Sequence, residues 1–512
     1  MHESAWISFD DDSFQDRLTV RVAAPVPADE RWLTRRRASD TLFAPGGARP
    51  TMPDPLYAVS PLDGRYAGRT APLREHVSEA ALMGARVRVE VEYLIALANL
   101  DATDLALDDD ERETLRDLYR SFEREDAELI KRLETEGAGE YPATNHDVKA
   151  VEYFVRLRLP DGFEDVDPWI HFGLTSEDVN NLAYRLLLTD ALREVLLPEL
   201  VAVRDALAGM AREHRDLPML ARTHGQPATP TTFGKEMAVY AARLARATAA
   251  VGRATDGLSG KLGGASGTYA AHVAAFPDVD WRAFAREFVA GIGLEFTPLT
   301  TQVNPCDDLA DLFDALRGAN DVLIDLALDM WLYVSDRYLG QEATAGEAGS
   351  STMPHKVNPI DFENGEGNLS KANSDLAFLA DYVTKSRLQR DLSDSTVKRN
   401  VGAALSHCLI GYTKTADGLE TVVPNEQVMR EDLEANPEVI GEAVQTILRR
   451  EGLDDAYERV KELSRGRRTS LEDFRELFDD LDVDESVTDE LRALTPAGYT
   501  GVADELVDEL EE

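Results

Sequence analysis

The segment 346–368 (GEAGSSTMPHKVNPIDFENGEGN) has the composition best suited to chemistry. It places glycines, two prolines, a serine pair that begins at Ser350, Lys356 and Asn358 between two stretches of helical pattern. This density of turn-forming residues predicts a loop. A connection between helices needs only a few residues, so a loop of this length favours a function. Backbone N–H groups of its glycines, together with Lys356 and Asn358, could bind a carboxylate.

Other candidate residues lie in short polar clusters next to helical patterns. The segment 221–235 (ARTHGQPATPTTFGK) places His224 in a turn-rich stretch, and a histidine can exchange protons near neutral pH. A histidine in a turn is, however, more often a surface or structural residue. Two further clusters could bind substrate or could simply be helix N-caps. They contain Asn145, His146 and Asp147, and Thr175 and Ser176 at the start of TSEDVNN.

The segment 387–400 (RLQRDLSDSTVKRN) gathers positive charge in a chain that is otherwise short of it. Arg390, Ser395 and Arg399 could surround a phosphate, because guanidinium groups pair well with phosphate oxygens. A basic helix face that pairs with acidic residues elsewhere would explain the same pattern. Both interpretations stay open at this point.

The overall charge narrows the possible partners. The 512 residues include 95 acidic and 54 basic side chains, and the net charge of −41 opposes binding to nucleic acid through phosphate neutralisation. The acidic residues are spread along the chain, and only ten of the basic residues are Lys. Because a dispersed acidic surface suits a salt-rich cytoplasm, we predict a cytoplasmic protein from a halophilic source.

The sequence indicates neither a membrane protein nor a metal or cofactor enzyme. No uninterrupted apolar run approaches the length of a membrane span. The nine His form no HExxH pattern, so we expect no metal. Cys306 and Cys408 are isolated, and we expect two buried thiols rather than a disulfide framework. GxGxxG and P-loop motifs are also absent, so no cofactor is expected.

The elements that must position these residues are helices. From about Leu73 onward, apolar residues recur at three- and four-residue spacing. The stretch 305–354 has no internal proline and is apolar on several faces. Its main stripe comprises Leu309, Leu312, Leu316, Leu323, Leu326 and Met330, and its other faces carry Val322, Ile324, Leu328 and Leu332. We therefore predict an all-α fold with a central long-helix bundle, whose helices are covered on most sides and which oligomerises.

Four segments are expected along the chain. Residues 1–51 carry a net charge of −1, contain no Lys and lack the apolar core of a secretory signal. They are either a disordered extension or precede a true start at Met52. Prolines and glycines interrupt the helical pattern near 165 and 421. We therefore expect an N-terminal helical domain over 52–165, a central long-helix domain over 166–421 with the catalytic loop 346–368, and a C-terminal helical domain over 422–512.

The segment Gly349–Pro359 (GSSTMPHKVNP) resembles the signature loop of the fumarase/aspartase superfamily, whose pattern is GSSxMPxKxNP. Its MPHK, with His355, and RTHGQPATP, with His224, look like the adenylosuccinate lyases. Fumarases of this type have MPGK and THLQDA, whereas argininosuccinate lyases have MPQK and THLQRA. Further matches run from about Tyr57 nearly to the end of the chain: PLDGRY (61–66), TNHDVKAVEYF (144–154), TSEDVNN, RDLSDSTVKRN and TPAGY (495–499).

The resemblance implies a three-domain helical fold that tetramerises through its central helices and eliminates fumarate from a succinyl group. It implies Ser350 as the general base and His224 as the general acid. The small-molecule substrates would be adenylosuccinate and SAICAR, bound at sites that different subunits build together. The implied phosphate contacts are Arg65, Tyr66, Arg390, Ser395 and Arg399. The implied succinyl contacts are Lys356, Asn358, Thr175 and Ser176, and further contacts are Asn145, His146, Asp147 and Gln302.

Two other functions fit the same resemblance. Another fumarate-releasing lyase, such as argininosuccinate lyase, would differ in its choice of substrate. A non-catalytic relative like the lens crystallins is also conceivable, but the chain retains Ser350, His224, His146, Lys356 and Asn358.

Overall fold

The computed structural model describes residues 55–341, 357–453, 455–464 and 469–511. The chain divides into two compact units, Met1–Ala58 and Val59–Glu512. Of the first unit, the structure describes only residues 55–58, with a 3₁₀ turn over Pro55–Tyr57. The predicted extension 1–51 therefore lies outside the described residues.

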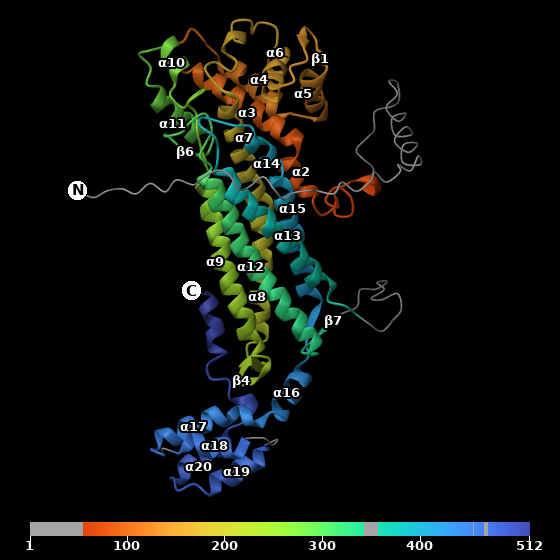
Figure 1. Ribbon diagram of the computed structural model, residues 1–512, viewed down its shortest axis with the longest axis vertical. Helices are drawn as coiled ribbons and strands as arrows, with labels where there is room; N and C mark the ends of the chain where they lie inside the picture. The colour runs from red at the N-terminus through yellow and green to blue at the C-terminus, as the bar shows by residue number, and fades with distance from the viewer. Residues whose placement is uncertain (1–54, 342–356, 454, 465–468, 512) are drawn as a thin grey trace, which may run out of the picture. The chain divides into compact units, whose positions relative to one another are not determined.

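Five long helices form the centre of the second unit (Figure 1). They are α8 (Leu197–Glu213), α9 (Phe233–Asp256), α12 (Asp307–Ser335), α13 (Ile360–Val383) and α15 (Val401–Thr421). Helix α8 packs on α9, α9 on α12, α12 on α13, α13 on α15, and α15 back on α8, so the five close a bundle. A sixth helix, α7 (Ser176–Ala191), runs into α8 through the π-helical turn Leu192–Leu196. The predicted all-α fold is confirmed.

Helix α12 shows how the sequence pattern directs the packing. All six residues of its predicted main stripe, from Leu309 to Met330, are buried. The sequence predicted that Leu328 and Leu332 are covered as well. In the single chain, however, they are 46% and 52% exposed, and the adjacent Trp331 is 44% exposed. Within one chain, this face of α12 is therefore apolar and uncovered.

Glycines let the bundle helices approach closely. At Gly411 in α15, a Cβ atom would lie 2.4 Å from the side chain of Leu369 in α13. At Gly418, about two helical turns further along α15, a Cβ atom would lie 2.9 Å from the ring of Phe362. Both distances are shorter than an ordinary contact, so these positions require glycine for packing rather than for backbone flexibility.

A smaller group of helices precedes the bundle. It comprises α2 (Arg74–Val77), α3 (Glu79–Leu97), α4 (Asp109–Arg120), α5 (Arg124–Thr135) and α6 (Asp147–Arg158). Helix α3 is central to this group because it packs against α4, α5, α6 and also α7. Between α9 and α12 lie α10 (Ala270–Ala275) and α11 (Trp281–Gly291), and α14 (Ser393–Lys398) precedes α15.

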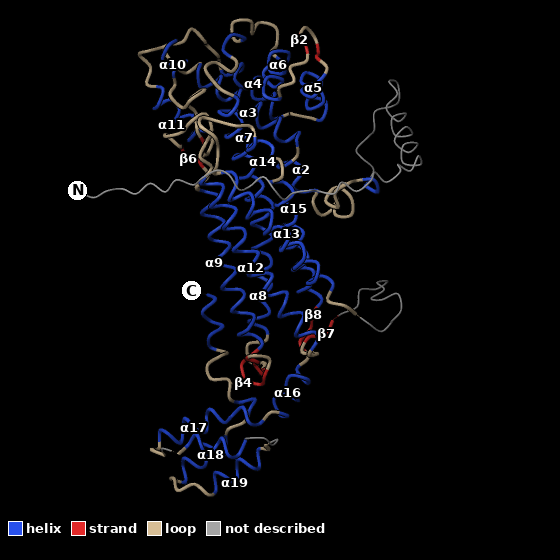
Figure 2. Tube along the Cα trace, in the orientation of Figure 1, coloured by secondary structure: helices blue, strands red, loops and turns tan. Residues whose placement is uncertain are grey.

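In the part of the chain that the structure describes, the strands are short and pair two by two (Figure 2). Three pairs are antiparallel and one is parallel. The antiparallel pairs are β1 (Gly137–Ala138) with β2 (Tyr141–Pro142), β3 (Pro218–Thr223) with β4 (Gln226–Thr232), and β7 (Leu339–Gln341) with β8 (Val422–Pro424). The parallel pair is β5 (Ser259–Gly260) with β6 (Glu295–Phe296). The β3–β4 hairpin joins α8 to α9.

Short helices follow the bundle and build a second apolar core. They are α16 (Glu426–Ala435), α17 (Gly441–Arg450), α18 (Ala456–Ser464), α19 (Leu471–Asp479) and α20 (Glu485–Ala493). Phe474 and Phe478 of α19 are fully buried in that core with Val444 and Leu448 of α17. A 3₁₀ helix, Glu505–Glu511, ends the described chain and packs on α9. None of the described helices is both long and apolar enough to cross a membrane.

The predicted loop 346–368 is wrong in its last part. Residues 342–356 lie outside the described residues, but α13 begins at Ile360, so residues 360–368 are helical. The glycines of this part suggested a turn. Gly365 instead faces α15, where a Cβ atom would lie 3.2 Å from Oγ1 of Thr415. It serves helix packing.

Gly411→Ala is expected to lower the free energy of unfolding by about 1–3 kcal/mol, because the added methyl group must displace Leu369. Gly209→Ala in α8 is the matched control. A Cβ atom there would meet no atom within 4 Å, so the substitution should stabilise the helix by about 0.5–1 kcal/mol. Thermal or denaturant unfolding of both variants measures the difference, and equal stabilities would contradict the close approach of α13 and α15.

Candidate active site

The start of α6 presents the cluster Asn145–His146–Asp147. His146 is the N-cap of α6, and its Nδ1 atom accepts a hydrogen bond from the backbone N–H of Lys149 at 3.2 Å. Asn145 has a positive φ of 48°, which turns the chain sharply into the helix. The imidazole of His146 is about half exposed. The N-cap interpretation is thus correct for His146, and its Nε2 edge remains available for a substrate.

Asp147 is fixed by arginines. Its carboxylate accepts a hydrogen bond from Nη2 of Arg86 at 2.8 Å and lies 3.9 Å from Nη2 of Arg399. Burial alone would raise the pKa of Asp147, but the charge and hydrogen bond of Arg86 outweigh it and hold that pKa below its ordinary value. Asp147 is therefore a carboxylate at neutral pH.

The start of α7 is fixed by contacts of the Asp178 carboxylate. Thr175 is the N-cap of α7, and its N–H donates to Asp178 at 2.9 Å. The buried Asp178 carboxylate also accepts from the N–H groups of Gly263 and Gly264 and pairs with Lys261 at 2.7 Å. These contacts join the turn before α7 to the loop after β5. They leave Ser176 facing a cavity.

The contacts of the basic segment 387–400 fit both interpretations of its sequence, a phosphate site and a basic face that pairs with acidic residues. Arg390 donates through Nη2 to Glu177 at 3.1 Å and through Nη1 to Oε1 of Gln302 at 3.3 Å. Lys398 is buried and pairs with Asp394 at 2.8 Å. The positive charges are thus paired with acids, yet Arg390 also lines the cavity beside Ser395 and Arg399.

A cavity of about 290 Å³ brings many of the predicted site residues together. It receives side chains from α3, α5, α6, α7 and the segment around α14. The predicted residues that line it are Asn145, His146, Asp147, Ser176, Arg390, Ser395 and Arg399. Thr175 directly precedes the lining residue Ser176. Gln302 accepts a hydrogen bond from the lining residue Arg390. Four cationic side chains line it, and they outnumber the three acidic ones, Glu134, Asp147 and Glu177, so the wall can accept a small anionic ligand.

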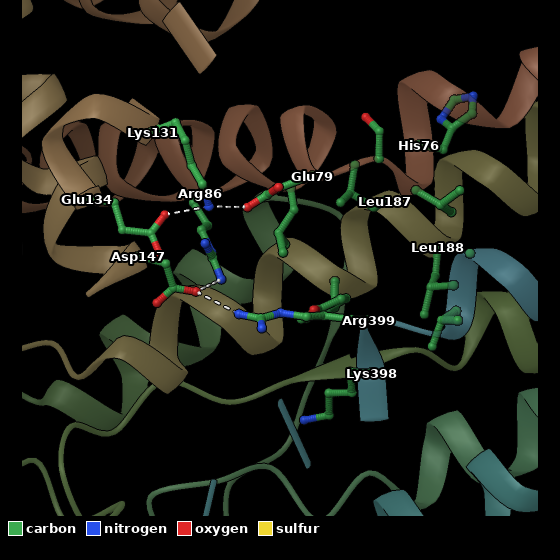
Figure 3. A pocket seen from close by; sticks show the side chains of 16 residues that line it. His76, Glu79, Arg86, Lys131, Glu134, Asp147, Leu187, Leu188, Lys398 and Arg399 are labelled. Carbon is green, nitrogen blue, oxygen red and sulfur yellow. Dashed lines mark hydrogen bonds and ion pairs between the residues drawn. The ribbon is translucent and has the colours of Figure 1, made fainter. Parts of the chain in front are cut away.

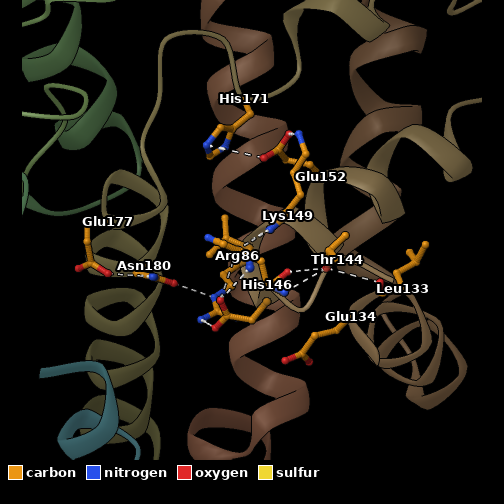
Figure 4. A network of polar contacts seen from close by, with 12 residues as sticks. Arg86, Leu133, Glu134, Thr144, His146, Lys149, Glu152, His171, Glu177 and Asn180 are labelled. Carbon is orange, nitrogen blue, oxygen red and sulfur yellow. Dashed lines mark hydrogen bonds and ion pairs between the residues drawn. The ribbon is translucent and has the colours of Figure 1, made fainter. Parts of the chain in front are cut away.

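Arg86 and Glu177 are site residues that the sequence analysis missed. Arg86 is 5% exposed and donates through Nε to Asn180 at 2.8 Å and through Nη2 to Asp147 (Figure 4). Asn180 in turn donates to Glu177 at 2.9 Å, which accepts from Arg390. This chain of polar contacts links α3, α6, α7 and the basic segment. An arginine within the apolar pattern of 79–97 was the available signal.

A second cavity, of about 390 Å³, adjoins the first (Figure 3). The two share six lining residues: Arg86, Glu134, Asp147, Tyr184, Lys398 and Arg399. Figure 3 shows Asp147 reaching both arginines and Lys131 reaching both Glu79 and Glu134. Because its charged groups are already paired, this second cavity extends the first rather than forming an independent anion site.

A partly buried histidine, His171, supports the helix that carries His146. His171 lies between two buried carboxylates, 2.6 Å from Glu90 and 3.8 Å from Glu152, and Glu152 also pairs with Lys149 of α6 at 2.6 Å (Figure 4). Burial alone would lower the pKa of His171, but the charge and hydrogen bond of Glu90 prevail and raise it. The protonated form of His171 is the one that the fold stabilises.

His224 lies at a different place in the chain. It forms the tip of the β3–β4 hairpin, with an exposed side chain. The hairpin meets the N-terminal end of α9, whereas the cavity lies near the C-terminal end, where β5 and Lys261 contact α7. Helix α9 has 24 residues, so about 36 Å separates the two ends. One chain therefore does not bring His224 to its own cavity.

Three further predicted residues, Arg65, Tyr66 and Asn358, do not line the cavity of their own chain. Arg65 is exposed, and the turn that carries it and Tyr66 is fixed to α15 by an ion pair of Arg69 with Asp417 at 2.7 Å. Asn358 precedes α13, and its carbonyl oxygen accepts from Gln341 at 3.4 Å. Ser350 and Lys356 lie outside the described residues.

The chain matches the family model described as Lyase over residues 64–373 and the model described as Adenylosuccinate lyase C-terminal over residues 386–500. An adenylosuccinate lyase of Haemophilus influenzae is 44% identical over 89% of this chain and 99% of its own length. The chain belongs to the adenylosuccinate lyase family. The corresponding enzymes of Escherichia coli and Dictyostelium discoideum are 44% and 42% identical. The predicted family and the class of carbon–nitrogen lyase are confirmed.

Solved structures agree with the fold of this family. A fumarate lyase from Mesorhizobium sp. BNC1 superimposes with a TM-score of 0.69 at 21% identity, covering 86% of this chain and 97% of its own. A 3-carboxy-cis,cis-muconate lactonizing enzyme from Pseudomonas putida gives a TM-score of 0.66 at 22% identity, covering 86% and 96%. The predicted fumarase/aspartase-type helical fold is confirmed.

The raised pKa of His171 predicts a pH dependence of stability. Its contribution is fully present below the unfolded-state pKa of about 6.5 and is lost as the pH rises through the higher folded-state pKa. His171→Gln should therefore destabilise the protein at about pH 6 and much less at about pH 9. Thermal midpoints of both proteins at the two pH values test this. A difference that is the same at both would show that the charge of His171 does not matter.

Proposed function

We propose that the protein catalyses the β-elimination of fumarate from adenylosuccinate, giving AMP, and from SAICAR, giving AICAR, in de novo purine synthesis. Membership of the family supports the reaction. The observation that carries the choice of substrate is the cavity that Arg390, Ser395 and Arg399 line together with His146, since it offers cations for a phosphate beside groups for a neutral ring.

In the proposed mechanism, Ser350 removes a proton from the carbon beside a carboxylate. The electron pair left behind expels the nitrogen, and His224 gives that nitrogen a proton. The intermediate carries two negative charges near one carbon, so the site must stabilise it electrostatically. Lys356, Asn358, Thr175 and Ser176 would hold the succinyl carboxylates. No step needs a metal or a cofactor.

The other site residues would bind the nucleotide. Arg390, Ser395 and Arg399, with Arg65 and Tyr66, would hold the phosphate. Asn145, His146, Asp147 and Gln302 would contact the remainder of the substrate. The hydrogen bonds of Arg390 to Glu177 and Gln302 and of Arg86 to Asp147 support this proposal, because they fix these side chains before substrate arrives.

We also propose a homotetramer with shared active sites. Two features support it: His224 lies a helix length away from the cavity of its own chain, and α12 exposes Leu328, Trp331 and Leu332. The proposed domains are 52–165, 166–421 and 422–512, and the last boundary coincides with the end of α15 at Thr421. Residues 1–51 would form an extension or precede the true start.

The charge of −41 supports a cytoplasmic enzyme of a halophilic source.

The test of the proposed function is a spectrophotometric assay with adenylosuccinate over a range of potassium chloride concentrations, with fumarate and AMP identified as products. Turnover should fade as salt is removed. A folded protein that leaves adenylosuccinate intact at every salt concentration but cleaves argininosuccinate would overturn the choice of substrate.

Ser350→Ala and His224→Ala should each lower kcat by at least about 100-fold, because each removes one proton-transfer group. Both should remain folded oligomers of wild-type size. Gly209→Ala, at a position that none of the proposed contacts involves, is the activity control. If either variant keeps near-normal turnover, the role assigned to that residue is wrong.

A further inference from the structure

The hairpin that carries His224 ends in a tight two-residue turn. Thr223 pairs with Gln226, and the two residues between them, His224 and Gly225, both have positive φ, of 54° and 71°. Two residues with positive φ form the turn whose twist fits a β-hairpin. Within the described chain, the His224 side chain makes no hydrogen bond or ion pair of its own. The hairpin backbone therefore sets the position of its Cα and Cβ atoms, from which the imidazole extends.

Strand β3 is tied to the C-terminal helices by a charged group. Arg222, two residues before His224, donates through Nη2 to Asp432 of α16 at 2.6 Å, and its Nε lies 3.6 Å from Asp336 at the end of α12. Tyr338 donates to the same Asp432 carboxylate. A guanidinium can face two carboxylates at once, so Arg222 joins the hairpin to two elements.

Strand β4 has a separate link to the same region. Thr229 donates to Oε2 of Glu442 in α17 at 3.0 Å, and Tyr499 of the TPAGY segment donates to that oxygen at 3.1 Å. Beneath these contacts, Leu220 of β3 is buried in a small apolar cluster with Leu433 and Val439. Both strands are thus attached to residues about 200 positions later in the chain.

We propose that the C-terminal region aligns the His224 hairpin for proton delivery, with Arg222 as a positioning residue. This rests on the proposed role of His224 as general acid. The linking groups are partly exposed, with 34% of the Arg222 side chain and 23% of that of Asp432 accessible, and such ion pairs add little to folding stability. An acid displaced by about 1 Å, by contrast, can cost on the order of 100-fold in rate. Alignment and stability can therefore be measured separately.

The experiment compares Arg222→Ala, Arg222→Lys and Asp432→Asn in the full-length protein. Arg450→Ala is the matched control, because Arg450 of α17 also joins two carboxylates, Glu451 and Glu490, but contacts no residue of the hairpin. Each variant is assayed for kcat and KM with adenylosuccinate, for its thermal midpoint and for its oligomer size. His224→Ala is assayed in parallel.

Arg222→Ala and Asp432→Asn should lower kcat by about 10- to 100-fold with KM within about twofold of wild type. Arg222→Lys, which keeps the charge but not the planar guanidinium, should recover only part of the rate, and the thermal midpoints should match that of Arg450→Ala. A kcat of Arg222→Ala within twofold of wild type, a loss shared by Arg450→Ala, or a loss that accompanies a fall in thermal midpoint or oligomer size would overturn the inference. If His224→Ala itself turns over normally, it is the proposed general acid that fails.

Discussion

The length of α9 is the constraint on which the arrangement of this protein depends. Its 24 residues hold the His224 hairpin and the substrate-sized cavity about 36 Å apart. A nucleotide substrate cannot bridge that distance, so both halves contribute to one reaction only if the hairpin end of one copy meets the cavity end of another. The uncovered apolar face of α12 is suited to such a contact, because burying it offsets the cost of association.

Most of the cationic side chains that line the cavity are paired with acidic residues. In a chain with a net charge of −41, the positive groups near α14 are held by nearby acids: Arg390 by Glu177, and Lys398 by Asp394. Arg399 differs, since its side chain is 68% exposed and its guanidinium comes no closer than 3.9 Å to the Asp147 carboxylate. The paired cations set the geometry of the wall, and Arg399 is left with most freedom to meet an anion.

The sequence was most informative where the physics is local. The stripe of α12 predicted its buried face, and helix N-caps were one of the two interpretations of the polar clusters at His146 and Thr175, because these patterns depend on neighbours within one or two turns. It failed where a partner lies far away in the chain. Gly365 suggested a turn but makes room for α15, and Arg86 finds Asn180 and Asp147 across 94 and 61 positions. The site residues themselves came from motifs.

The most direct test of shared sites mixes two defective proteins. His146→Ala damages the cavity end and His224→Ala the hairpin end, so neither should be active alone. After both are dissociated together and reassembled, random mixing of subunits should restore about a quarter of the wild-type activity, since half of the sites receive each intact residue. Recovery near that level supports sites built between copies. If the mixture stays as inactive as its parents while the oligomers have exchanged subunits, the two residues act within one chain and the account is wrong.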